Sequence, residues 1–115
     1  MDCIFCKIAN HEISSKIVAE NDYVIAFEDL SPVAPVHVLV VPKIHIANIM
    51  ELNEDNLIYV KEVHKMIQEV ARIKGVSESG FRVITNYGED GGQTVQHLHY
   101  HVIGGKTLGP KIVHD

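Results

Sequence analysis

The sequence predicts an α+β fold: one domain over residues 1–115, with an antiparallel sheet of about five strands, one long helix and a short N-terminal helix. Two observations predict this class. Short segments rich in β-branched residues stand before and after a single long stretch of helical periodicity. In addition, 115 residues are enough to build one hydrophobic core but too few for two.

The first elements are a short helix and a hairpin. Residues 4–9 form an amphipathic start, and the alternating segments 17–20 and 23–28 predict two strands. Between them lies Asn21-Asp22, a pair typical of a two-residue hairpin turn. Residues 29–35 contain two prolines, which resist both helix and sheet, so a loop follows the hairpin.

A third strand and the long helix come next. Residues 36–41 predict a strand that the following proline ends. We expect Asn53 to cap a helix with acidic residues in its first turn and basic residues in its last, and Gly75 lies where this helix would end. Residues 81–85 and 95–103 predict the last two strands.

Composition and charge exclude several classes of protein. The chain is 46% apolar and 22% charged, as in ordinary globular domains. Its net charge of −5 makes nucleic acid a poor partner, although a local group of donors can still hold a small anion. No apolar run approaches the roughly 20 residues that span a bilayer, so no membrane partner is expected. Since the first residues lack the pattern of a secretory signal, we expect a cytoplasmic protein.

Three histidines alternate with apolar residues near the end of the chain, at His97, His99 and His101. Successive side chains of a strand point to opposite faces, so the three imidazoles are expected to share one face, with neighbours about 6–7 Å apart. Glycine-rich segments flank them at 88–92 and 104–105, and glycines let backbone N–H groups approach an anion closely. The pattern predicts a phosphate site with its own candidate acid, base and nucleophile.

The same three histidines fit a second interpretation, which stays open from the pattern alone. A strand can supply zinc ligands from alternate positions, as in a zinc-dependent hydrolase.

The segment 97–103, HLHYHVI, resembles the signature of the histidine triad (HIT) family. The segments 3–13, 27–46 and 84–105 are similar to the nucleoside phosphoramidase branch in order and spacing. The resemblance implies a HIT-like fold, a purine nucleotide ligand (AMP, GMP or phosphoramidate derivatives) and no organic cofactor. It also implies hydrolysis of a P–N bond through a covalent nucleotidyl-histidine, and a homodimer whose sheet continues across the interface.

The resemblance assigns catalytic roles to five residues. It makes His99 the nucleophile, with its second ring nitrogen held by the backbone carbonyl of His97. It implies that His101 bonds the phosphate and helps to protonate the leaving amine, and that His37 supports the triad. Thr94 stands where most relatives of this branch have serine. The hydroxyl is kept, but the added methyl group stiffens the rotamer.

The resemblance also implies a nucleotide pocket, in which Asp29 holds the ribose hydroxyls. An aspartate before Ser31-Pro32 is otherwise an ordinary turn residue, as Asn86 is at the end of a strand. The further contacts implied for the nucleotide are Ile4, Phe5, Phe27, Leu30, Asn86, Gly92, Gln93, Thr94, His99 and His101. The apolar members of this set are equally expected in an ordinary core.

A Cys-x-x-Cys pair at Cys3 and Cys6 is half of a four-ligand metal site. Some triad relatives pair two such cysteines with a histidine after the central strand and the first triad histidine, here His45 and His97. The resemblance therefore implies a closed, structural Zn²⁺ site. Two buried thiols or a redox pair are the alternatives.

Other functions remain open at this stage. A dinucleoside polyphosphate hydrolase of the same family and a non-catalytic nucleotide-binding or scaffold protein are both compatible with the sequence. The breadth of the apolar face on the long helix predicts a partner helix in the dimer. In dimeric relatives the C-terminal tail, here with His114, reaches the partner's active site.

Overall fold

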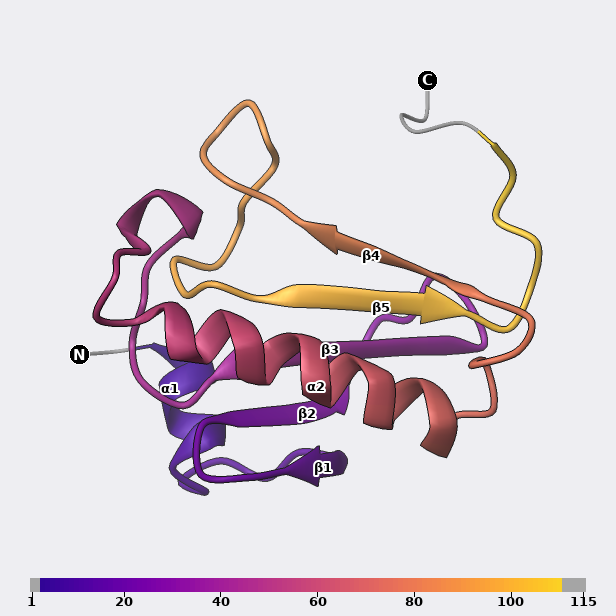
Figure 1. The fold of residues 1–115 in the computed structure, drawn as a ribbon, viewed down its shortest axis with the longest axis horizontal. Helices are drawn as coiled ribbons and strands as arrows, with labels where there is room; N and C mark the ends of the chain where they lie inside the picture. Colours follow the sequence, from indigo (N-terminus) through magenta and orange to yellow (C-terminus); the bar gives the residue numbers. More distant parts are fainter. Residues whose placement is uncertain (1–2, 111–115) are drawn as a thin grey trace.

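The computed structural model describes residues 3–110, and His114 with the rest of the tail lies outside them. Its five strands form one antiparallel sheet in the order β1-β2-β3-β5-β4 (Figure 1). The elements are α1 (Ile4–Ala9), β1 (Ile17–Glu20), β2 (Val24–Glu28), β3 (Val36–Pro42), the 3₁₀ turn η1 (Ile49–Glu51), α2 (Leu57–Ile73), β4 (Phe81–Thr85) and β5 (Tyr100–Gly104). The α+β prediction is confirmed. Among the described residues, no helix is both long and apolar enough to cross a membrane.

The two faces of the sheet carry separate hydrophobic clusters. In β3, Val38 and Val40 belong to the larger cluster, which lies under α2. Leu39 and Val41, one residue out of step, belong to a smaller cluster with α1. This alternation follows from the period of two in a strand. His37 is in phase with Leu39, and His101 of β5 pairs with Leu39, so both histidines lie on the α1 face.

The helix α2 begins later than the sequence predicts. Asn53 does accept backbone hydrogen bonds, from the amides of Asp55 at 2.8 Å and Asn56 at 3.2 Å. These bonds close a separate turn over residues 53–56, and the regular helix starts at Leu57. The asparagine therefore caps the turn that leads into the helix. The hairpin turn is also one residue longer than expected, because Asn21 accepts from the amides of both Tyr23 and Val24.

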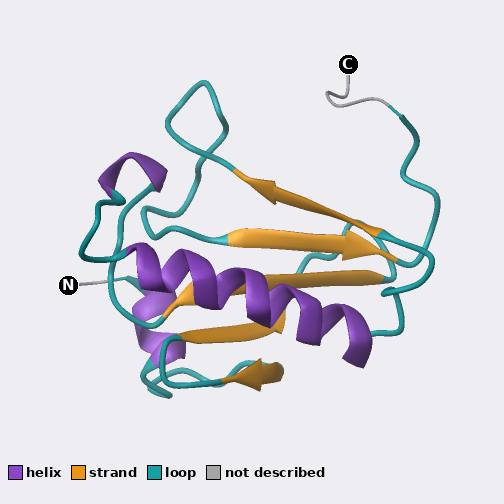
Figure 2. Ribbon diagram, viewed as in Figure 1, coloured by secondary structure: helices purple, strands orange, loops and turns teal. Residues whose placement is uncertain are grey.

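The last strand is shorter than predicted. The sequence predicts residues 95–103, but β5 begins at Tyr100, and residues 86–99 are loop (Figure 2). Tyr100 is the first residue of β5, and it already pairs with both neighbouring strands, with Val40 of β3 on one side and Thr85 of β4 on the other. Because β4 ends at Thr85, residues 95–99 lack a partner on that side. The alternation of histidine and apolar residues predicted a strand at 95–99, but β4 has no residues there with which it could form backbone hydrogen bonds.

The central part of α2 is expected to contribute most to stability. Met66 is 1% exposed in the cluster under α2, so Met66→Ala should lower the free energy of unfolding by about 2–5 kcal/mol through lost burial and a residual cavity. Met50→Ala is the matched control, since Met50 is 70% exposed, and its effect should stay within about 0.5 kcal/mol. Urea denaturation of both variants measures the difference. Equal effects would contradict this assignment of the core.

Candidate active site

The histidines of the predicted triad separate into two groups. The ring centroids of His99 and His101 are 5.3 Å apart, and those of His101 and His37 are 5.1 Å apart. The ring of His97 does not join them, because it faces His45, 5.1 Å away between centroids, and the N-terminal cysteines. All three imidazoles nevertheless lie on the α1 face, as expected: Phe5 of α1 packs against both His97 and His99, and the alternate residues Leu98, Tyr100 and Val102 belong to the cluster under α2. What alternation does not predict is that the ring of His97 turns toward the cysteines rather than toward His99.

His99 is held in one tautomer by the backbone. Its Nδ1 lies 2.7 Å from the carbonyl oxygen of His97, which can only accept, so Nδ1 carries the proton and donates. The lone pair of the ring is then on Nε2. The contact implied by the family resemblance is present. The ring is 6% exposed and packs edge-to-face against Phe5, with centroids 5.1 Å apart.

Thr85 is a site residue that the sequence analysis missed. It ends β4, and its hydroxyl donates to the carbonyl oxygen of His99 at 2.8 Å. This bond fixes the main chain at the residue that directly precedes β5. A threonine at the end of a strand is ordinary, so nothing in the sequence distinguished it.

A second chain of hydrogen bonds fixes His37 and His101. The amide of Val33 donates to Nδ1 of His37 at 3.1 Å, so the proton of a neutral His37 is on Nε2. That nitrogen lies 2.9 Å from Nδ1 of His101, which therefore accepts. His101 is left with its proton on Nε2. Burial, with a smaller effect of the neighbouring histidines, lowers the pKa of His101 to about 4, so the ring is a neutral donor at pH 7.

Asp29 lies beside His37, the first histidine of this series of hydrogen bonds. One carboxylate oxygen accepts the amide of Ser31 at 2.7 Å, as in an Asx turn, and the other is 3.4 Å from Nε2 of His37. Asp29, His37 and His101 are close enough together to be considered as metal ligands. However, Nε2 of His37 carries its proton in the tautomer that Val33 selects. The nitrogen that would face a cation has no free lone pair, so this group does not suit a metal.

The glycine-rich loop is braced by two amide side chains. Gln93 accepts from the amide of Gly88 at 3.1 Å and donates to the carbonyls of Ala47 and Val95 at 2.8 and 3.0 Å. Asn86 donates to the carbonyl of Gly91 at 2.7 Å. Both side chains are thus bonded within the protein.

A β-carbon on Gly91 would lie 2.1 Å from the backbone oxygen of Tyr87, so the turn requires glycine there. Gly92, the next residue, has φ +76°, in the region that favours glycine.

The remaining predicted contacts divide by burial. Phe5 and Phe27 are buried and meet edge-to-face with centroids 5.6 Å apart. Ile4 is exposed, and Leu30 is 91% exposed on the loop after β2. Thr94 is exposed next to the braced loop. Leu30 is therefore accessible to a ligand, while Phe5 and Phe27 are packed in the interior.

The second histidine group is a candidate metal centre. Nδ1 of His97 lies 3.2 Å from Sγ of Cys3 and 3.5 Å from Sγ of Cys6, and Nδ1 of His45 lies 3.3 Å from Sγ of Cys6. All four donor atoms are within 4.8 Å of one another. Tetrahedral zinc at ordinary bond lengths places sulfur and nitrogen ligands about 3.5 Å apart. The spacing of the donors fits this metal.

The chemistry of the four donors also fits zinc. Nε2 of His97 donates to the carbonyl of Pro42 at 2.9 Å, which leaves the lone pair of Nδ1 directed at the sulfurs. Burial lowers the pKa of His97 to about 4, so the ring is neutral, as a ligand must be. Burial and the adjacent Cys3 raise the pKa of Cys6 to about 11, so without a cation this thiol keeps its proton.

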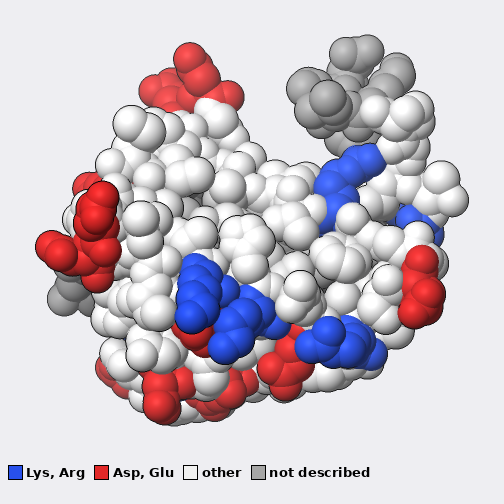
Figure 3. Space-filling view, viewed as in Figure 1, with Lys and Arg blue, Asp and Glu red and all other residues white. Residues whose placement is uncertain are grey.

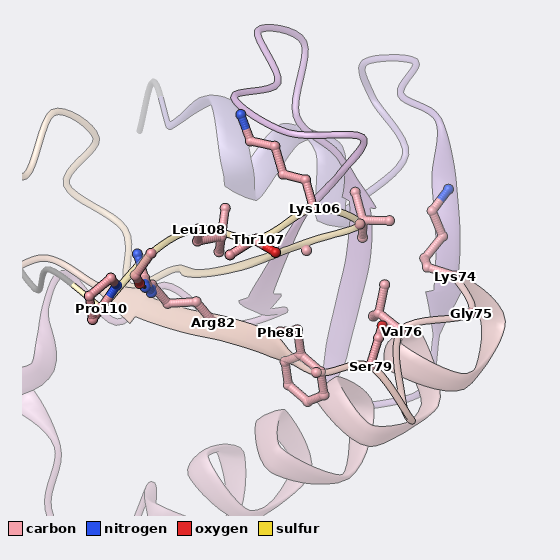
Figure 4. A pocket seen from close by; sticks show the side chains of 15 residues that line it. Lys74, Gly75, Val76, Ser79, Phe81, Arg82, Lys106, Thr107, Leu108 and Pro110 are labelled. Atoms are coloured by element: carbon pink, nitrogen blue, oxygen red, sulfur yellow. The ribbon is translucent and has the colours of Figure 1, made fainter.

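A cavity of about 710 Å³ lies elsewhere, at the other end of β5. Its lining comes from Lys74–Arg82 and Gly104–Pro110, together with Val36, and it includes none of the predicted site residues (Figure 4). On the face drawn in Figure 3, basic and acidic side chains are interspersed. That face is not the continuous basic surface that nucleic-acid binding uses.

The comparisons with known proteins agree with the geometry. Residues 10–108 match the family model of the HIT domain. The chain is 38% identical over 113 residues to the purine nucleoside phosphoramidase of Escherichia coli K12, covering 98% of this chain and 95% of that protein. It is 43% identical over 107 residues to an uncharacterized HIT-like protein of Synechococcus elongatus, covering 93% of each.

Solved structures show the same likeness. A HIT family hydrolase from Clostridium thermocellum has a TM-score of 0.95 at 51% identity, with 97% of each chain covered. A histidine triad protein from Clostridium difficile has a TM-score of 0.93 at 52% identity, with 96% of each chain covered. Sequence and structure match over nearly the whole chain, and this protein belongs to the HIT family.

Proposed function

We propose that this protein hydrolyses purine nucleoside 5′-phosphoramidates, cleaving the P–N bond through a covalent nucleotidyl group on His99. The observation that carries the proposal is the 2.7 Å bond between His99 Nδ1 and the carbonyl of His97. It leaves Nε2 as an unprotonated nucleophile. The likeness to a purine nucleoside phosphoramidase over nearly the full chain supports the substrate class.

The reaction has two steps. Nε2 of His99 first attacks the α-phosphorus, so that a bond from phosphorus to the imidazole forms while the bond to the leaving amine breaks. The amine leaves with a proton. Water then attacks the same phosphorus, the bond to the imidazole breaks, and the nucleoside monophosphate is released. His101 donates a hydrogen bond from Nε2 to the phosphate and helps to protonate the amine by relaying a proton from solvent. The attacking water releases a proton to solvent in the second step, so both histidines return to their starting forms.

The remaining groups hold the nucleotide. The carboxylate oxygen of Asp29 that is not bonded to the amide of Ser31 accepts from the ribose hydroxyls. Leu30, Ile4 and Phe5 form the apolar slot for the base, together with Phe27 behind them. The Thr94 hydroxyl donates a hydrogen bond to the phosphate, and the backbone at Gly92 contacts it. Gly92 lies in the loop that the side chains of Asn86 and Gln93 stabilise. His37 acts as a positioning residue for His101.

The same proposal includes a structural zinc ion held by Cys3, Cys6, His45 and His97. A closed site with four protein ligands leaves no open position for water, so the metal contributes folding free energy rather than chemistry. Its residues join α1, the loop after β3 and the segment before β5.

We also infer a homodimer that continues the sheet across β4. This strand is at an edge of the sheet, and its residues Phe81 and Val83 are exposed apolar side chains. Such an edge offers unpaired backbone groups to another strand. The other edge strand, β1, contains a register irregularity, follows Lys16 and ends with Glu20, features that disfavour pairing. Exposed apolar residues of α2, including Ile73, extend the surface.

Removing the nucleophile tests the reaction. His99→Ala should lower turnover of an adenosine phosphoramidate by about 10⁴-fold or more while AMP still binds. Base-quenched mass spectrometry of the wild type should find a nucleotidyl adduct on His99. His64→Ala, on the exposed side of α2, is the control and should retain activity. An adduct on another residue, or full activity in His99→Ala, would exclude this mechanism.

Chelation separates this mechanism from that of a zinc-dependent hydrolase. Removing the metal should lower the melting temperature, because its binding free energy contributes to folding, while turnover at saturating substrate persists. Calorimetry and a phosphoramidate assay on the same sample measure both. Loss of all turnover with recovery on adding Zn²⁺ would favour the zinc-dependent hydrolase.

The interface is tested at the two sheet edges. The wild type should sediment as a dimer at micromolar concentration, and Val83→Lys on β4 should shift it toward monomer, because it places a charge in the paired strand. Ile17→Lys on β1 is the matched control, since Ile17 is 41% exposed and Val83 is 42% exposed. A monomeric wild type, or an equal effect of both substitutions, would refute this interface.

A further inference from the structure

The cluster of Cys3, Cys6, His45 and His97 shares structural parts with the candidate nucleotide site. Cys3 is the N-cap of α1 and Cys6 lies within it, and the same helix carries Ile4 and Phe5. His97 directly precedes the Leu98-His99 segment. Two of the three segments that form the cluster therefore continue into the histidine site.

The first connection runs through α1. This helix has six residues, too few to be stable by itself, so its position depends on tertiary contacts. Sγ of Cys3 accepts from the amide of Cys6 at 3.4 Å, which ties the start of the helix to the cluster. Phe5 lies between the two cysteines in the sequence. The centroid of its ring is 5.1 Å from that of His99 and 5.9 Å from that of His97. A shift of α1 would move this ring against the nucleophile.

The second connection runs through a single residue. The side chain of His97 belongs to the cluster. Its carbonyl oxygen accepts a hydrogen bond from Nδ1 of His99, with the two atoms 2.7 Å apart. Residues 95–99 are outside the sheet, so individual contacts hold them. The amide of Leu98 donates to the carbonyl oxygen of Ile46 at 2.7 Å, and Nε2 of His97 donates to the carbonyl oxygen of Pro42 at 2.9 Å. Fixing the ring of His97 therefore also fixes the acceptor of the nucleophile.

We propose that a thiophilic divalent cation in this cluster and a purine nucleotide in the histidine site strengthen each other's binding. Bonds from a cation to the four donors would restrict α1 and the peptide of His97, both of which the nucleotide site uses. A nucleotide that orders the same segments lowers the cost of ordering them for the cation. The effect is reciprocal, since linkage requires equal factors in both directions. The proposal rests on the nucleotide site described above.

The test uses wild-type protein, Zn²⁺ and AMP. Calorimetric titration should give an AMP dissociation constant at least about fivefold lower for the zinc-loaded than for the zinc-free protein. Competition with a chromogenic chelator should give a Zn²⁺ affinity that AMP raises by the same factor. In the zinc-free protein, the Nδ1 proton of His99 should also exchange faster by nuclear magnetic resonance.

A pair of histidine variants provides the control. His45 is an exposed member of the cluster, so His45→Ala should weaken Zn²⁺ binding and remove the effect of Zn²⁺ on AMP without disturbing the core. His64→Ala, also exposed but outside the cluster, should retain both.

The outcomes separate this inference from the proposed function. AMP affinities that agree within twofold in the two zinc states would overturn the coupling and leave the nucleotide site intact. Failure to bind Zn²⁺ at all would overturn it too, while the His99 adduct could still be found. Failure to bind AMP in either state would overturn both the coupling and the proposed function.

Discussion

The site depends on backbone groups that hold His97, His99 and His37 each in one tautomer, and His37 in turn fixes His101. The carbonyl of His97 accepts a hydrogen bond from Nδ1 of His99, and the carbonyl of Pro42 accepts one from Nε2 of His97. The amide of Val33 donates to Nδ1 of His37. Either nitrogen of a neutral imidazole can carry the proton, so a ring without such a partner has no fixed role. A backbone group does not titrate near neutral pH, and the roles it assigns do not change with the protonation of a neighbour.

These backbone groups are available because the sheet ends where it does. If residues 95–99 continued β5 as a regular strand, their carbonyls and amides would be used in ladder bonds. Because β5 begins at Tyr100, the carbonyl of His97 is free to accept from a side chain two residues away. Thr85 bonds the carbonyl of His99 at the point where the ladder starts. The strand positions His101, while the irregular segment before it positions His99 and directs His97 away.

The sequence predicted the parts of this arrangement that are local. The bounds of α1, β1 and β4 agree with the structure, and alternation placed His99 beside His101. Alternation also placed His97 on the α1 face, but it could not predict the partners of its ring, because the N-terminal cysteines and a carbonyl from β3 hold it over a long sequence separation. Its membership of the metal cluster was indicated by the family resemblance instead. Val33 and Thr85 contribute an amide and an ordinary hydroxyl, which carry no recognisable pattern.

The net charge of the chain is −5, so the proposed phosphate ligand would be held by local groups, because the overall field repels an anion. Burial lowers the pKa of His101 to about 4, and this ring meets its neighbour as a neutral donor. Two imidazolium rings with centroids 5.3 Å apart would repel each other and would each require desolvation. A neutral His101 avoids the repulsion and the cost of desolvating its own charge. The same burial thus allows adjacent histidines to differ in function, with a lone pair on His99 and an N–H on His101.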